Sequence, residues 1–159
     1  LEVQAEKVEK TLERVVSEWK ELRRNKEHLT GSLARLMAEK FLSTAEDISG
    51  LRLVSQIFGV TSADVELLIK VSNELVKMDS KAIAIFVSVD GNARIVAMVG
   101  KAAQKIGVDA QEIAQVAASE LGGGGSGRRD FAQGGGTRIE GAPKALEKAR
   151  LIVYEKVGG

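Results

Sequence analysis

The stretch GGGGSGRRDFAQGGG, residues 122–136, holds eight of the chain's 17 glycines in fifteen positions. Glycine loses more conformational entropy on folding than any other residue, so such a run weakens a fold unless a flexible tether or a close backbone approach requires it. Between the two glycine clusters stand two arginines, an aspartate, a phenylalanine and a glutamine. A tether rarely carries such a group of side chains. The composition therefore predicts a structured loop over residues 122–136.

The residues around this loop alternate between strand and helix patterns. Apolar runs bounded by turn residues predict strands over 51–58, 82–89 and 93–99, with a tight Asp90–Gly91 turn between the last two. Capping signals predict helices that begin with a Thr61–Asp64 capping box, at Lys101, at Asp109 with Glu112, and at Pro143. The order strand, helix, hairpin, helices, loop and helix predicts a small globular α/β subdomain over residues 49–159.

Residues 1–47 are predicted to be helical and form a helical subdomain that ends at residue 48. Apolar residues recur every seven positions from Leu1 to Leu36, and four of the six companion positions, four residues later, are also apolar. This spacing is typical of a coiled-coil or helix-hairpin seam. Gly31 and Ser32 could break the helix, so the subdomain is either one long helix or helix–loop–helix, and we favour two helices.

The apolar seam of this helical arm needs a partner, because each fully buried leucine or valine contributes about 1.5–3 kcal/mol. Either the arm folds back on its own domain or it pairs with a second copy of the chain. Since no other segment carries a matching heptad stripe, we favour a homodimer. The predicted dimer interface consists of Leu1, Val8, Leu12, Val15, Trp19, Leu22, Leu29, Leu33 and Leu36.

The composition excludes several classes of function. The chain has no cysteine, which rules out disulfides and thiolate metal sites and fits a reducing cytoplasm. It has no run of eighteen apolar residues, so we expect no membrane span. Its net charge is +1, so any binding of nucleic acid must come from local basic patches. Because it begins with Leu1 already in helical register, we expect a segment of a longer protein.

No catalytic pattern is evident in the 159 residues. The glycine run satisfies the dinucleotide-binding spacing only trivially, and it follows a predicted helix where that fingerprint follows a strand. A Gly-Lys-Ser/Thr phosphate loop, a nucleophile–histidine–acid set and a metal-ligand cluster are all absent from the sequence. We therefore expect this segment to catalyse no reaction and to bind no cofactor or metal.

The glycine-rich stretch resembles the signature of the C-terminal domain of alanyl-tRNA synthetase, in which a glycine run, a Gly-Arg-x-Asp-x-Ala-Gln core and a second glycine cluster recur. Gly127, Arg128, Asp130, Ala132 and Gln133 match this core, while Arg129 stands where proline is commoner. The order of a helical subdomain, an α/β part, the glycine motif and a last helix is similar as well. The resemblance covers essentially the whole chain.

The resemblance implies a non-catalytic module that dimerises the synthetase, binds the outer corner of tRNA(Ala) and links aminoacylation to editing in the cytoplasm. ATP and zinc would then be bound only by upstream domains of an alanine–tRNA ligase. The same α/β domain accompanies DHH-type phosphoesterases, in which a histidine normally follows the glycine run; this chain has Ser126 there and no Asp-His-His. The alternatives are therefore the substrate-binding domain of such a phosphoesterase, or a plain dimerisation module.

Several residues are candidates for contact with RNA. Glycine amides can approach phosphates closely, arginines can pair with phosphates, and an aromatic ring can stack on an unpaired base. Alternatively, Asp130 pairs with Arg128 and Phe131 anchors the loop to the core, and for Phe131 we favour the core. The predicted RNA-binding residues are Gly124, Gly125, Gly127, Arg128, Arg129, Gln133, Lys101, Lys105 and Lys144.

Overall fold

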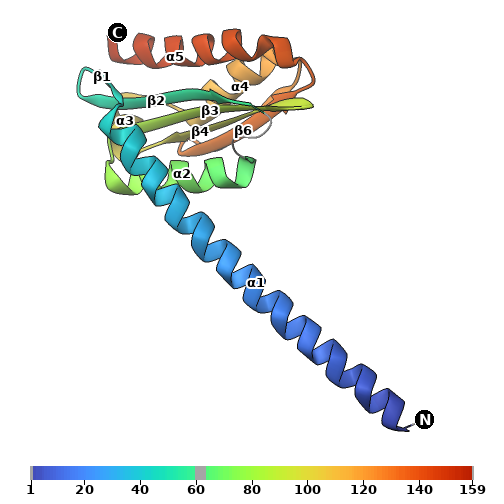
Figure 1. Ribbon diagram of the computed structural model, residues 1–159. Coiled ribbons are helices and arrows are strands. Elements are labelled where there is room, and N and C mark those ends of the chain that lie inside the picture. Colours follow the sequence, from blue (N-terminus) through green and yellow to red (C-terminus); the bar gives the residue numbers. More distant parts are fainter. Residues whose placement is uncertain (1, 60–63, 159) are drawn as a thin grey trace. The chain divides into compact units, whose positions relative to one another are not determined.

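The computed structural model describes residues 2–59 and 64–158. It confirms the predicted class, a long N-terminal helix followed by a domain with a mixed sheet (Figure 1). The helices are α1 (Glu2–Ser43), α2 (Val65–Met78), α3 (Lys101–Ile106), α4 (Ala110–Glu120) and α5 (Ala142–Gly158), with a 3-10 turn at Ile139–Gly141. The strands are β1 (Glu46–Ile48), β2 (Leu51–Phe58), β3 (Ala82–Asp90), β4 (Asn92–Val99), β5 (Gly124–Gly127) and β6 (Phe131–Gly136).

Helix α1 runs without a break through Gly31, so the prediction of two helices is wrong. A glycine inside a helix costs only about 1 kcal/mol relative to alanine, which the surrounding helical residues can offset. The hydroxyl of Thr30 donates a hydrogen bond to the carbonyl oxygen of Lys26 at 2.7 Å, so this polar side chain is accommodated within the helix. The chain divides into two compact units, Leu1–Leu33 and Ala34–Gly159.

The second unit is built on a six-stranded sheet with the order β1-β2-β3-β4-β6-β5. Strands β2 and β3 are parallel and connected through α2, and all other neighbouring strands are antiparallel. The predicted hairpin of β3 and β4 is confirmed, with Asp90 opposite Asn92 and Gly91 at a φ of 68°, a conformation that glycine accepts readily. Strand β6 therefore lies inside the sheet and β5 forms its edge.

Two hydrophobic cores lie on the two faces of this sheet. Strand β3 contributes to both, because Ile83, Ile85 and Val87 face one core while the alternating Ala84 and Phe86 face the other. Helices α4 and α5 cover the first face, and α2 covers the second (Figure 1). We call these the α4–α5 face and the α2 face.

The last turns of α1 belong to the core on the α2 face. Ala34 and Ala38 are fully buried in it, and the ring of Phe41 lies 5.6 Å from the ring of Phe86. Ala34 and Ala38 are small residues of this core, and the contacts of the Phe41 ring with Phe58 and Phe86 add to the area that is buried. This packing explains why the second compact unit begins at Ala34.

The helix and strand boundaries correct the sequence prediction at two places. Asp64 is the N-cap of α2 and accepts a hydrogen bond from the N–H of Leu67 at 2.8 Å; Thr61, the predicted cap, lies outside the described residues. The helix predicted over residues 1–47 ends at Ser43, and Glu46 and Asp47 belong to strand β1, which was not predicted. This strand pairs with β2 across a tight turn in which Ser49 and Gly50 have φ values of 52° and 91°.

Candidate nucleic-acid interface

The predicted glycine loop is a β-hairpin and not an irregular loop. Strands β5 and β6 pair from Gly124–Gly135 to Gly127–Ala132, and β6 also pairs with β4. The turn between them is fixed by backbone hydrogen bonds: the N–H of Val99 donates to the carbonyl oxygen of Asp130, and the N–H of Ala110 to that of Arg129, both at 2.9 Å. The segment is therefore structured, as expected, but as part of the sheet.

The packing of α4 accounts for Gly125 of this hairpin and contributes at Gly134. A Cβ atom added to Gly125 would lie 2.6 Å from the carbonyl oxygen of Ala114 in α4, and one added to Gly134 would lie 3.0 Å from the Cβ of Ala118. Distances below 3 Å are far inside van der Waals contact, so the hairpin and the helix touch backbone to backbone. Gly124 is different, since nothing lies within 4 Å of a Cβ built there.

Both arginines of the turn take part in surface ion pairs. Arg128 Nε lies 3.3 Å from Asp130 Oδ1, and Arg129 Nε lies 4.0 Å from a carboxylate oxygen of Asp109. The Arg128 and Arg129 side chains are 77% and 66% exposed. Exposed ion pairs of this kind are worth about 0–1 kcal/mol. Either guanidinium can therefore exchange its carboxylate for a phosphate at little cost.

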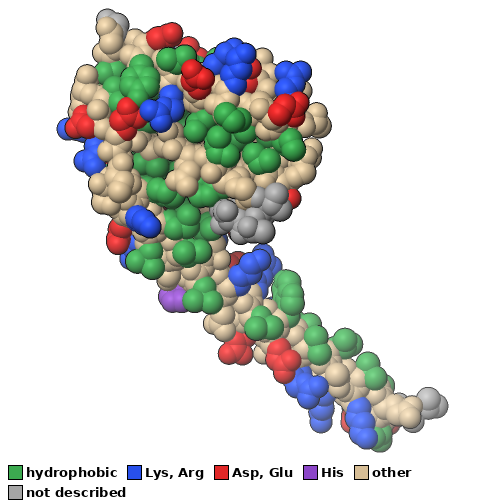
Figure 2. Space-filling model, turned by 45° about the horizontal axis from the view of Figure 1, so that its top comes forward, with side chains coloured by type: hydrophobic (Ala, Val, Ile, Leu, Met, Phe, Trp, Pro, Cys, Tyr) green, Lys and Arg blue, Asp and Glu red, His purple; other side chains and the backbone are tan. Residues whose placement is uncertain are grey.

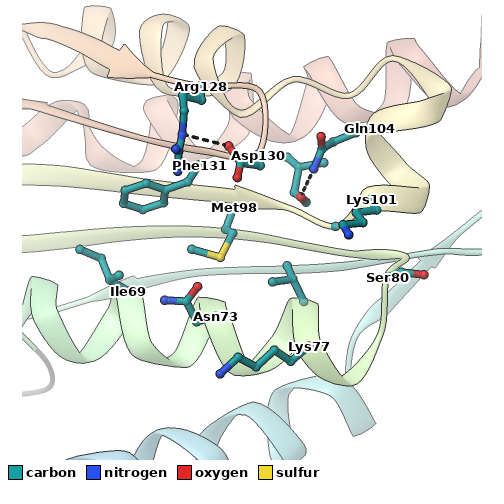
Figure 3. Close-up of a pocket in the computed structure, with 13 residues that line it drawn as sticks. Ile69, Asn73, Lys77, Ser80, Met98, Lys101, Gln104, Arg128, Asp130 and Phe131 are labelled. Carbon is teal, nitrogen blue, oxygen red and sulfur yellow. Dashed lines mark hydrogen bonds and ion pairs between the residues drawn. The ribbon is translucent and has the colours of Figure 1, made fainter.

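A groove with a volume of 620 Å³ lies on the α2 face, beside the turn of the hairpin (Figure 3). Its walls come from α2, from the end of β4, from α3 and from the residues around the turn. Both Lys101 and Arg128 line the groove, and these two cations were predicted separately from the sequence to bind RNA. The groove also adds residues that the sequence did not indicate, chiefly Asn73, Lys77 and Met98.

The same face of the sheet continues along β4 and β6 beyond this groove. Facing residues in these strands are paired, first Met98 with Phe131, then Val96 with Gln133. The next pair on this face, Arg94 with Gly135, lines a second depression of 380 Å³ together with Gln133. Gln133 and Arg94 are both exposed. Gln133, which was predicted to bind RNA, therefore lies close to Arg94, a cation that was not predicted to do so.

Phe131 is half-buried and packs against the core of the α2 face, which agrees with the structural role favoured for it. Its position in the wall of the groove leaves part of the ring available to a ligand. Lys105, on α3, is exposed but is not among the residues that line the groove. Of these cations predicted from the sequence, Lys101 and Arg128 therefore line the groove and Lys105 does not.

Lys144 lies on the other face of the sheet. Its ammonium group is 4.0 Å from Glu120, whose carboxylate also accepts a hydrogen bond from Lys148. The bond from Lys148 is the main reason that the pKa of Glu120 lies below its ordinary value, with the charges of Lys148, Lys144 and Arg138 adding to the effect. Basic and acidic side chains are likewise mixed on the surface seen in Figure 2. This face therefore offers no field of unpaired positive charge around Lys144.

The predicted dimer interface is an exposed apolar stripe on α1. Trp19, Leu22 and Leu29 are 57%, 68% and 67% exposed, and hydrophobic side chains are visible along the helix in Figure 2. Leu1 lies outside the described residues. The other members of the predicted interface are all exposed: Val8, Leu12, Val15, Trp19, Leu22, Leu29, Leu33 and Leu36.

Within residues 2–59 and 64–158, no three histidine, aspartate or glutamate side chains gather in a way that could hold a metal ion. Within the same ranges, no helix combines the length and apolar character that a membrane crossing requires.

Comparison with known proteins agrees with the geometry. The family model described as the DHHA1 domain matches residues 53–155. The alanine–tRNA ligase of Methanococcoides burtonii is 35% identical over 99% of this chain, and that of Methanosarcina acetivorans is 33% identical over 98% of it. The chain spans only 17% and 16% of the length of these two ligases.

Solved structures give the same assignment. The crystal structure of the C-Ala domain from Aquifex aeolicus alanyl-tRNA synthetase matches with a TM-score of 0.61 and 26% identity, covering 69% of this chain and 97% of that one. A DHH-domain protein described as a member of the s1p family of ribosomal proteins has a TM-score of 0.52 at 13% identity, over 76% of this chain and 30% of its own, which shows a shared fold alone. The chain therefore belongs to the DHHA1 domain family, in the form that alanyl-tRNA synthetases contain.

Proposed function

We propose that this chain is a module of an alanine–tRNA ligase that binds the outer corner of tRNA(Ala) and dimerises the enzyme, and that it works in the cytoplasm. The observation that supports this most directly is the similarity to alanine–tRNA ligases over 99% of the chain. The cations beside the hairpin supply a surface for the RNA backbone, and the stripe on α1 supplies a surface for a second copy. The segment itself catalyses no reaction, and aminoacylation belongs to other parts of the ligase.

The proposed RNA surface includes Arg128 and Arg129, because both guanidiniums are exposed and only weakly held by carboxylates. Binding of a tRNA(Ala) transcript should be measured by fluorescence anisotropy at several salt concentrations. Each lost phosphate contact lowers the slope of log K against log salt by about 1, so Arg128→Ala with Arg129→Ala should lower it by about 1–2. An unchanged affinity and slope would remove the hairpin turn from the RNA surface.

The proposed dimer rests on the exposure of large apolar side chains along α1. Sedimentation equilibrium of the chain at tens of micromolar should give twice the monomer mass. Leu22→Glu places a charge in the stripe and should yield a monomer, whereas Lys20→Glu, also on α1 but outside the heptad positions, should leave the dimer intact. A wild-type chain that sediments as a monomer at these concentrations would contradict the proposal.

A further inference from the structure

The groove on the α2 face combines an apolar wall with a cationic rim. Met98 and Phe131 are register partners in β4 and β6, so their side chains lie next to each other in the wall, and Ile69 of α2 stands opposite (Figure 3). Val76 of α2 also lines the groove. Met98 is almost completely buried and Phe131 half-buried. Such a wall suits a flat, apolar group, because sulfur and aromatic carbon both pack well against a π face.

The rim of the groove concentrates positive charge on a nearly neutral chain. Lys77, Lys101 and Arg128 line it, against the single carboxylate of Asp130. Lys77 pairs with Glu74 at 3.6 Å and Arg128 with Asp130, while Lys101 forms no ion pair with any residue that the structure describes. The chain as a whole carries a charge of only +1. The lining of the groove therefore carries more positive than negative charge.

The groove also offers an amide that can read the edge of a base. Asn73, on the side of α2 that faces the groove, is exposed and points toward the space between the helix and the sheet (Figure 3). No hydrogen bond to its side chain occurs within the described residues. An amide side chain carries both donors and an acceptor, which is what the edge of a nucleobase requires.

We propose that this groove holds one unpaired nucleotide of an RNA, with its base against Met98 and Phe131 and its phosphate toward Lys101 and Arg128. Bases inside an RNA duplex are stacked and cannot reach such a wall, whereas bases in loops can be turned out and stacked on aromatic side chains. The volume of 620 Å³ lies in the range of about 300–1,000 Å³ typical of small-ligand sites. The inference builds on the proposed function, because it names the part of a tRNA that the surface selects.

A peptide fits the groove less well than a nucleotide. An extended peptide adds itself to the free edge of a sheet, but β6, which carries Phe131, is paired on both sides with β4 and β5. An amphipathic helix needs a long apolar channel and gains little from three cations at the rim. The charge and the flat wall together favour a nucleotide.

Methionine-methyl NMR provides a direct test, because the sequence contains only three methionines, Met37, Met78 and Met98. Only Met98 lines the groove. With methyl-labelled protein, a single-stranded RNA oligonucleotide and the tRNA(Ala) transcript should both move the Met98 signal upfield, through the ring current of the stacked base. The Met37 and Met78 signals should stay in place, and a duplex RNA of the same length should leave Met98 unmoved.

A charge-matched pair of variants completes the test. Lys101→Ala should weaken binding of the single-stranded RNA about three- to tenfold and lower its salt slope by about 0.7. Lys156→Ala removes the same charge from α5, on the other face, where the lysine pairs with Glu112 at 3.6 Å. It should bind the RNA like the wild-type chain.

These experiments distinguish a failure of the groove inference from a failure of the proposed tRNA binding. If tRNA binds while Met98 stays unmoved and the two lysine variants behave alike, the groove inference is wrong and the proposed tRNA binding stands. If neither RNA binds at all, both are wrong. An equal Met98 shift with duplex RNA would exclude selection of an unpaired nucleotide. Binding of AMP as tight as that of the oligonucleotide would make the groove a site for free nucleotides and overturn RNA as its occupant.

Discussion

The packing account of the glycine hairpin makes a sharp prediction about two neighbouring residues. In Gly125→Ala, the new methyl group would lie 2.6 Å from the carbonyl oxygen and 2.7 Å from the carbonyl carbon of Ala114. Both atoms belong to the backbone of α4, so no side chain can turn aside, and the hairpin or the helix must shift. Overpacking of this kind costs about 1–3 kcal/mol. For a chain of this length, about 1 kcal/mol corresponds to about 2–4 °C in Tm, so we expect a loss of about 2–12 °C.

Gly124→Ala is the matched control one residue earlier in β5. Its Cβ would meet nothing within 4 Å, and the residue does not have a positive φ, so alanine fits and reduces the entropy of the unfolded chain. We expect a Tm equal to that of the wild type or slightly higher, since such substitutions contribute about 0.4–1 kcal/mol. Thermal unfolding followed by circular dichroism measures both variants. Equal Tm values for Gly125→Ala and Gly124→Ala would refute the idea that close helix packing requires these glycines.

Three further predictions test other contacts. Because the pKa of Glu120 is lowered in the folded chain, its stabilising effect is complete above the ordinary value of 4.5 and is lost as the pH falls through the folded value. Glu120→Gln should therefore reduce the unfolding free energy by more at pH 7 than at pH 3 in urea titrations, and an equal loss at both pH values would contradict this. Asp64→Ala removes the cap of α2 and should cost about 1 kcal/mol in the same titrations at pH 7, whereas an unchanged midpoint would show that the cap is dispensable. Gly91→Ala forces a side chain to a φ of 68° and should cost about 1–2 kcal/mol; a stability equal to wild type would mean that the turn can rearrange.

Much of the fold follows from local signals in the sequence. Apolar runs predicted β2, β3 and β4, and the aspartate at position 109 was recognised as the cap of α4, where its carboxylate accepts a hydrogen bond from Gln111. The heptad pattern predicted the helical arm but not its continuity, because the cost of one glycine is small beside the sum of its neighbours' propensities. Strand β1 is only three residues long, and its Ser49–Gly50 turn was the one local sign of it.

The sequence analysis identified only part of the reason for the glycines in the hairpin. Its glycines indicated a close backbone approach, and the partner is α4 of the same chain at Gly125 and Gly134, whereas Gly123 and Gly127 approach the paired strand of the hairpin itself and Gly135 approaches β4. The signal for this lay in α4 itself, where Ala114, Ala117 and Ala118 recur at helical spacing and are all fully buried. Small residues on one face of a helix next to a glycine-rich segment indicate a close contact between the two. The contact between α4 and the glycine-rich segment could therefore have been predicted from the sequence.

The groove could not have been predicted in the same way, because it depends on the order of strands that are distant in sequence. Met98 and Phe131 become neighbours only because β6 pairs with β4 after α3, α4 and β5 have intervened. Asn73 and Lys77 come from a third element, α2, whose exposed side carries no unusual pattern. Sequence analysis could name Lys101 and Arg128 as cations, but only the topology places them at one site.

The limited charge of this surface bears on how such a module would act. A groove with three cations and one carboxylate makes few phosphate contacts, so the chain alone should bind RNA weakly and its affinity should fall only gradually as salt rises. Within a ligase that holds the same tRNA elsewhere, binding at the groove becomes intramolecular, and its effective concentration is set by the connection between the parts. Weak binding is then sufficient, and it leaves product release unhindered. On this argument, strengthening the groove with further cations should raise the affinity of the isolated chain for tRNA while slowing the release of charged tRNA by the whole enzyme.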